Sequence, residues 1–128
     1  MMKLQDQVPS LELCKKLKEL GYPQNGLWWW WKVVKDTDEY IISLKENMPP
    51  IYKENDKIDN EFQAYVAPTV AEMGEFLKED ILPQYYHGEK QWVWYSEDSN
   101  DVCITANTEA DIRAKVLIYL TEQGHIQL

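Results

Sequence analysis

Four consecutive tryptophans, Trp28 to Trp31, constrain the fold of this 128-residue chain more than any other feature. They lie in the segment LWWWWKVV, whose aromatic and β-branched side chains favour a strand. Successive side chains of a strand point to opposite faces, so Trp28, Trp30 and Lys32 share one face and the other two indoles share the opposite one. A core on one side cannot bury all four tryptophans. We therefore expect either a cover over both faces or partly exposed indoles.

Both alternatives have a plausible chemistry. The segment 45–66 is long enough to cover the outer face of the strand, whereas exposed tryptophans would form a platform for a protein partner, a base or a sugar. Trp92 and Trp94 alternate in the same way within QWVWY and could extend the aromatic surface. The candidate partner surface is therefore made of Trp28, Trp30, Lys32, Trp92 and Trp94.

Two β-hairpins are expected from runs of strand-forming residues that flank polar turns. The first joins segments 27–34 and 39–44 through the turn 35–38. The second joins segments 91–95 and 102–105 through the acidic turn 96–101. Between the hairpins, segment 45–66 loses its periodicity, so we expect a long surface loop with a short strand near 63–66.

A helix is expected over residues 11–20, where leucines and Cys14 recur at helical spacing opposite a charged face. Ser10 is a good N-cap, Gly21 suits the position after the helix, and Pro23 prevents its continuation.

Two further helices have capping signals at their starts. Thr69 and Glu72 have the spacing of a capping box, which predicts a helix over 70–80 that ends before Pro83. Gly74 weakens that helix by about 1 kcal/mol relative to alanine. Thr108 and Asp111 repeat the capping pattern before a last helix. Its apolar stripe is Ile112, Val116, Tyr119 and Leu120, and Gly124 ends it.

This order predicts an α+β fold, αββαββα, with an antiparallel sheet of about four strands packed by helices on one face. The length suits a single domain over residues 1–128. Helix, tryptophan-rich strand, polar turn and strand occur in 11–44 and again in 70–105. We interpret this weak repetition as architectural, since the residues themselves do not repeat.

The charge of the chain argues against nucleic acid as a direct ligand. The net charge is −9, and the segment 67–128 carries most of it, with four basic and eleven acidic side chains. Such a field repels phosphate backbones. Acidic side chains also keep a surface soluble, which is the simpler interpretation. Residues 1–10 lack the apolar core of a secretory signal and no segment suits a membrane span, so we expect a cytoplasmic protein.

Catalytic and cofactor motifs do not stand out. The sequence has no phosphate-binding glycine loop, no GxSxG and no HExxH. The two histidines, His87 and His125, lack metal-ligand spacing. Cys14 and Cys103 sit in apolar patterns typical of buried free thiols, and a Cys103–His87 nucleophile pair is the alternative. We expect no enzyme, no cofactor and no metal.

Two acidic clusters leave a cation site open as an alternative. They are Asp36, Asp38 and Glu39, and Glu97, Asp98 and Asp101. Oxygen ligands of this kind suit Ca²⁺ or Mg²⁺. Short acidic side chains also favour turns by bonding to the local backbone, which is the interpretation we prefer.

Three segments resemble small uncharacterised proteins of phages, prophages and mobile elements. They are residues 13–23 (LCKKLKELGYP), residues 65–72 (YVAPTVAE, a YxAPTxxE pattern) and the helix that begins EADIRAK at Glu109. The likeness covers about half of the chain and carries no known activity, so it transfers no functional residue. It implies an accessory protein that works in the cytoplasm of a host cell.

These observations favour a non-enzymatic accessory protein that binds a macromolecular partner, most simply a protein. One alternative is a binder of small planar ligands such as nucleotides, held between aromatic rings. Another is an acidic mimic of DNA, which needs Glu72, Glu75, Glu79, Glu97, Asp98 and Asp101 on one face. An exposed tryptophan face or a free hairpin edge would also allow a homodimer.

Overall fold

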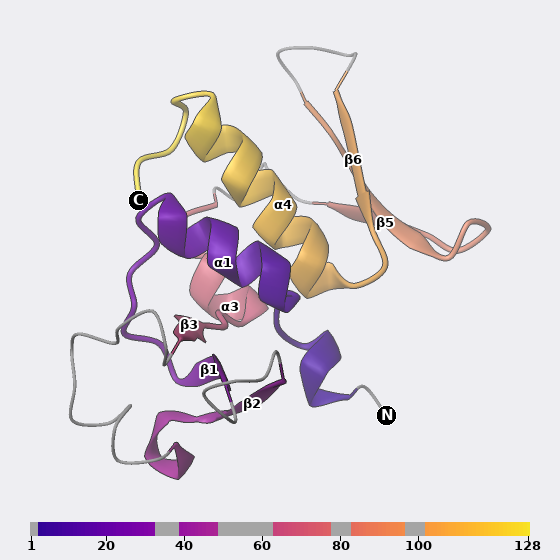
Figure 1. Cartoon of the computed structure of the whole chain (residues 1–128). Helices are drawn as coiled ribbons and strands as arrows, with labels where there is room; N and C mark the ends of the chain where they lie inside the picture. The colour runs from indigo at the N-terminus through magenta and orange to yellow at the C-terminus, as the bar shows by residue number, and fades with distance from the viewer. Residues whose placement is uncertain (1–2, 33–38, 49–62, 78–82, 97–101) are drawn as a thin grey trace.

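The computed structural model describes residues 3–32, 39–48, 63–77, 83–96 and 102–128, and the structural statements below concern these residues. The elements in chain order are η1 (Leu4–Asp6), α1 (Leu11–Glu19), β1 (Trp28–Lys32), β2 (Tyr40–Leu44), η2 (Lys45–Asn47), β3 (Ala64–Val66), α3 (Val70–Met73), β4 (Gln84–Tyr86), β5 (Gln91–Tyr95), β6 (Cys103–Ala106) and α4 (Glu109–Glu122). The expected α+β class is confirmed (Figure 1).

The described strands form two antiparallel three-stranded sheets, so the expectation of one sheet of about four strands is wrong. The first sheet has the order β2-β1-β3 and the second has the order β4-β5-β6. The strand pairs of both predicted hairpins are present, with Trp30 opposite Ile42 in the first and Trp94 opposite Ile104 in the second. The predicted turns, at 35–38 and 96–101, lie outside the described residues except for Ser96. No described strand of one hairpin pairs with a strand of the other, and β3 and β4, each three residues long, add one edge strand to each hairpin. A short strand at 63–66 was expected, whereas β4 was not.

The helix α1 has the predicted bounds to within one residue and ends as expected at Gly21. Gly21 has a φ of +98°, the left-handed conformation that favours glycine. The Tyr22 N–H donates to the Leu17 carbonyl at 2.9 Å and the Gly21 N–H donates to the Lys18 carbonyl at 3.1 Å, which is a Schellman ending.

The start of α1 differs from the prediction in its capping chemistry. Ser10 occupies the N-cap position, but its side chain makes no capping hydrogen bond. Instead the Ser10 backbone N–H donates to Asp111 Oδ1 at 2.8 Å. Asp111 therefore links the beginning of α1 to the first turn of α4. Thr108 caps α4 as predicted, because its Oγ1 accepts from the Asp111 N–H at 3.1 Å.

The helix α3 has the predicted capping box and is shorter than predicted. Thr69 Oγ1 accepts from the Glu72 N–H at 3.2 Å, and Glu72 Oε1 accepts from the Thr69 N–H at 3.0 Å. Regular helix ends at Met73, and residues 74–77 form turns. Gly74 is the first residue after the helix, which fits its low helix propensity.

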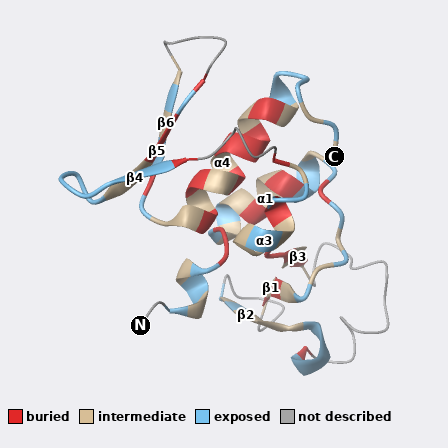
Figure 2. Ribbon diagram, turned by 180° about the vertical axis from the view of Figure 1, so that it is seen from behind, coloured by how far each residue is buried: buried red, intermediate tan, exposed pale blue. Residues whose placement is uncertain are grey.

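The helix α4 is the centre of the core. It buries side chains around most of its circumference: Ala110, Ile112, Ala114, Val116, Leu117, Ile118 and Leu120. It contacts α1, α3, β5 and β6, and α1 in turn contacts β3. Figures 1 and 2 show the result, in which the helices connect the two sheets and do not all cover one face of a single sheet. A helix that is apolar nearly all round can pack on two sides at once.

Candidate functional site

The four consecutive tryptophans are packed on both faces of β1. Trp29 and Trp31 are buried, and their indole N–H groups donate to the Gly26 carbonyl at 3.0 Å and to Ser43 Oγ at 2.9 Å. Trp28 and Trp30 on the other face are half-buried and pack with the N-terminal segment and α1. All four tryptophans are therefore at least partly covered. The idea that segment 45–66 supplies the cover falls mainly on residues outside the described part.

Trp30 illustrates how this face of β1 is covered by the N-terminal segment. Its indole N–H donates to the Pro9 carbonyl at 3.0 Å, and its ring belongs to a cluster with Val8, Cys14 and Ala67. The face of β1 that the sequence suggested as a partner surface is thus in contact with the segment before α1 and with α1 itself.

The remaining predicted site residues lie in two different places. Lys32 is at the end of β1, half-buried beside Tyr40 of β2. Trp92 and Trp94 are on the inner face of the second sheet, where they pack into the main core, and the Trp94 ring lies 6.0 Å from the Tyr119 ring of α4. The two tryptophan sets belong to separate sheets, so they do not form one continuous aromatic surface.

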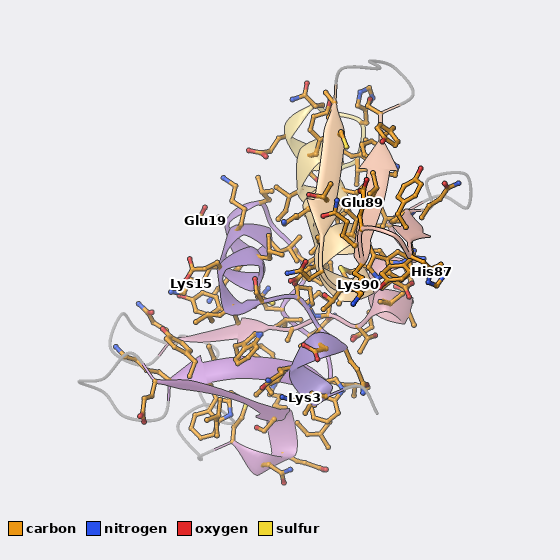
Figure 3. All side chains as sticks on the ribbon, turned by 90° about the vertical axis from the view of Figure 1, so that its right-hand side faces the viewer. Lys3, Lys15, Glu19, His87, Glu89 and Lys90 are labelled. Atoms are coloured by element: carbon orange, nitrogen blue, oxygen red, sulfur yellow. The ribbon has the colours of Figure 1, made fainter. Side chains whose placement is uncertain are left out.

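Lysines of α1 stack on tyrosines of the first sheet. Lys15 Nζ lies 5.3 Å from the centre of the Tyr40 ring and 5.8 Å from that of Tyr65, and Lys18 Nζ lies 5.1 Å from the Tyr65 ring (Lys15 is labelled in Figure 3). These cation–π contacts attach the helix to the sheet. Burial, followed by the charges of Glu12 and Glu19, raises the pKa of Tyr65 above its ordinary value, which favours the uncharged hydroxyl that donates to Gln63 Oε1 at 3.3 Å.

The outer face of the second sheet has a different character. We call it the tyrosine face, and it consists of Gln84, Tyr86, Gln91, Val93, Tyr95, Cys103 and Thr105, which the strand register places on the side opposite Trp92 and Trp94. Tyr95 is 55% exposed and Tyr86 is 40% exposed, whereas Val93 at the centre is buried. The face thus combines a small apolar centre with two large exposed aromatic side chains.

The surroundings of the tyrosine face are polar. The turn between β4 and β5 carries His87, Glu89 and Lys90, all exposed (Figure 3). The pKa of Tyr95 lies above its ordinary value, first because of the neighbouring Cys103 thiol and then because of Tyr86. Both influences favour the uncharged Tyr95 hydroxyl, the form that can donate a hydrogen bond.

The sequence contained a signal for this face that the tryptophans obscured. In QWVWY, Tyr95 alternates with the two tryptophans, so it must lie on the opposite face. Which face the helices would cover was not visible in the sequence. The tyrosines of β4 were missed because that strand was not predicted.

The expectation that both cysteines are buried is right for Cys14 and wrong for Cys103. Cys14 is buried in the contact between α1 and the first sheet, whereas Cys103 is exposed on the tyrosine face. A Cys103–His87 nucleophile pair is also wrong. His87 follows β4 and packs edge-on against Tyr85, with ring centres 4.8 Å apart, whereas Cys103 lies in β6 on the far side of β5.

The two thiols are expected to react at very different rates. Burial, with a further contribution from Asp111, raises the pKa of Cys14 above its ordinary value, and only a thiolate is nucleophilic. A disulfide reagent added to the native protein should therefore modify one thiol per chain quickly, and both after denaturation. A Cys103→Ser variant should lose the fast phase. Equal rates for both thiols in the native protein would contradict the burial of Cys14.

Most residues of the proposed acidic sites lie outside the described ranges. These are Asp36, Asp38, Glu79, Glu97, Asp98 and Asp101. Glu72 is described and is engaged in the α3 capping box. Within the described ranges, no group of three or more His, Cys, Asp or Glu side chains could hold a metal ion. No described helix is long and apolar enough to cross a membrane.

Comparison with known proteins adds no relative. No protein-family model matches the chain, and neither a curated protein nor a solved structure matches it significantly.

Proposed function

We propose that the protein is a non-enzymatic accessory protein of phage or mobile-element origin that acts in the host cytoplasm by binding a partner protein. The tyrosine face of the second sheet is the contact surface. The three segments that resemble phage and mobile-element proteins support the origin, and the net charge of −9 disfavours a nucleic-acid partner.

One observation carries the choice of surface. Tyr86 and Tyr95 are exposed on a face with a buried apolar centre, whereas the tryptophans of β1 and the inner tryptophans of β5 are packed against helices or the N-terminal segment. Tyrosine is enriched at the energetic centres of protein interfaces, because it presents a large rigid ring and a hydroxyl. The charged turn 87–90 beside it resembles the polar rim of such interfaces.

Comparative affinity capture from the producing cell tests this proposal. The baits are the wild-type protein, a Tyr86→Ala/Tyr95→Ala double variant and a Leu27→Ala control. Leu27 is 65% exposed and precedes β1 of the other sheet, so it is a matched exposed apolar side chain. A protein that the wild type and the control retain, and that the double variant loses, is the expected result.

The captured protein is then purified and its affinity measured directly. An interface tyrosine at an energetic centre contributes about 2 kcal/mol or more, so the double variant should bind at least about 30-fold more weakly. Equal affinity of wild type and double variant would contradict the proposal.

A further inference from the structure

The inference concerns the free edge of β6, and it begins with the hydrogen-bond pattern between β5 and β6. The Ser96 N–H donates to the Val102 carbonyl at 3.1 Å. Because bonded and non-bonded pairs alternate in an antiparallel ladder, Trp94 and Ile104 form the next bonded pair. The backbone groups of Cys103 and Thr105 therefore point away from β5, toward the open edge of the sheet.

These outward groups are only partly used. The Thr105 carbonyl accepts from Lys115 Nζ at 2.9 Å. In the described part of the chain, no hydrogen bond reaches the outward N–H of Thr105 or the outward N–H and carbonyl of Cys103. Both residues are exposed. The edge thus presents donors and an acceptor at the two-residue spacing that an added strand would pair with.

In the first sheet, side chains form hydrogen bonds with the outward backbone groups of the edge strand β3. There the outward carbonyl of Ala64 accepts from Lys18 Nζ at 3.3 Å, and the outward N–H of Val66 donates to Gln24 Oε1 at 3.0 Å. At the other side of the second sheet, β4 is three residues long and follows Pro83, which has no N–H. The β6 edge is closed in the same way only at the Thr105 carbonyl, by Lys115, and it contains no proline.

We propose that the β6 edge binds an extended, basic segment of the partner protein as an additional strand. This proposal rests on the proposed function, since the added strand would border the tyrosine face through Cys103 and Thr105. Its side chains would alternate, one set lying beside Cys103 and Thr105 on the tyrosine face and the other on the Ile104 side.

The acidic charge around β6 favours a basic segment as the added strand. Residues 95–111, which contain β6 and both of its flanks, hold five acidic side chains and no basic one. Arg113 and Lys115 follow, so residues 95–115 carry a formal net charge of −3. Arg113 and Glu109 form an ion pair at 2.9 Å, and Lys115 lies at the Thr105 carbonyl. A second copy of this chain would bring the same acidic segment to the edge and be repelled, whereas a strand with lysines or arginines would be attracted.

The test begins with a phage-displayed library of random peptides about twelve residues long, from which binders to the full-length protein are selected. This length is sufficient to pair with one strand edge. The selected peptides should be rich in Lys or Arg. Each backbone N–H of one such peptide is then methylated in turn. Methylation at every second position should weaken binding by about tenfold, because it removes a hydrogen bond, and methylation between these positions should not.

Variants of the protein provide the second arm. Thr105→Pro removes the outward N–H without removing a ladder bond to β5, and Thr105→Ala is the control that keeps the N–H. The proline variant should bind the peptide about tenfold more weakly, and the alanine variant should bind it within about twofold of wild type. If circular dichroism shows that Thr105→Pro is unfolded, the methylation scan tests the proposal without this variant.

Four results would overturn the proposal. The first is a methylation scan without a two-residue period. The second is wild-type affinity in a folded Thr105→Pro variant. The third is a wild-type dimer in sedimentation equilibrium that Thr105→Pro dissociates, which would assign the edge to a second copy. A peptide that loses affinity in Tyr95→Ala but not in Thr105→Pro would overturn strand addition and leave the tyrosine face as the binding surface.

Discussion

Replacing Leu117 with alanine is expected to lower the free energy of unfolding by about 2–5 kcal/mol. Leu117 has 0% exposure and lies in the middle of α4, the helix that contacts α1, α3, β5 and β6. Truncation removes apolar contacts and leaves a cavity that the surrounding helices and strands can fill only in part. Urea unfolding followed by tryptophan fluorescence measures the loss, since the indoles lie in both sheets.

The matched control is the same substitution at an exposed leucine. Leu27→Ala, at a side chain that is 65% exposed, should change the free energy of unfolding by no more than about 0.5 kcal/mol. If Leu117→Ala were as stable as the control, α4 would not be the centre of the core, and the arrangement of helices between two sheets would be wrong.

Replacing Trp30 with alanine is expected to lower the free energy of unfolding by about 3 kcal/mol. The ring packs with Val8, Cys14 and Ala67, and its N–H bonds to the Pro9 carbonyl, so both contributions are lost together. Trp30→Phe keeps an aromatic ring and removes the hydrogen bond, and it should lower the same free energy by about 0.5–1.5 kcal/mol. Urea unfolding of the three proteins separates packing from hydrogen bonding.

A Trp30→Ala variant with wild-type stability would contradict this account of the tryptophan run. The first sheet would then present Trp30 without a structural role, and the tryptophan surface suggested by the sequence would become the better candidate for partner binding. The stability of this one variant therefore distinguishes a packed tryptophan from one that is available for binding.

Local signals in the sequence predicted the local structure well. The leucine stripe with Gly21 predicted α1, the Thr69–Glu72 capping box predicted the start of α3, and the aromatic and β-branched runs predicted both hairpins. Each of these features depends on contacts within a few residues. For the same reason the length of α3 was overestimated, because a helical pattern that continues past Gly74 does not show where the chain turns.

The division into two sheets could not be read from the sequence. Whether two hairpins join edge to edge depends on contacts between residues far apart in the chain, and β3 and β4 are too short to give a periodic pattern. The same limit applies to the site. Alternation in QWVWY separates Tyr95 from the tryptophans, but only the position of α4 against Trp94 shows which side is left exposed.

Hydrogen–deuterium exchange of the protein bound to its captured partner tests most directly whether the tyrosine face is the binding surface. The amides of β5 and β6, residues 91–95 and 103–106, should gain protection on binding, whereas those of β1 and β2, residues 28–32 and 40–44, should exchange as in the free protein. Protection confined to β1 and β2, with β5 and β6 unchanged, would contradict the account.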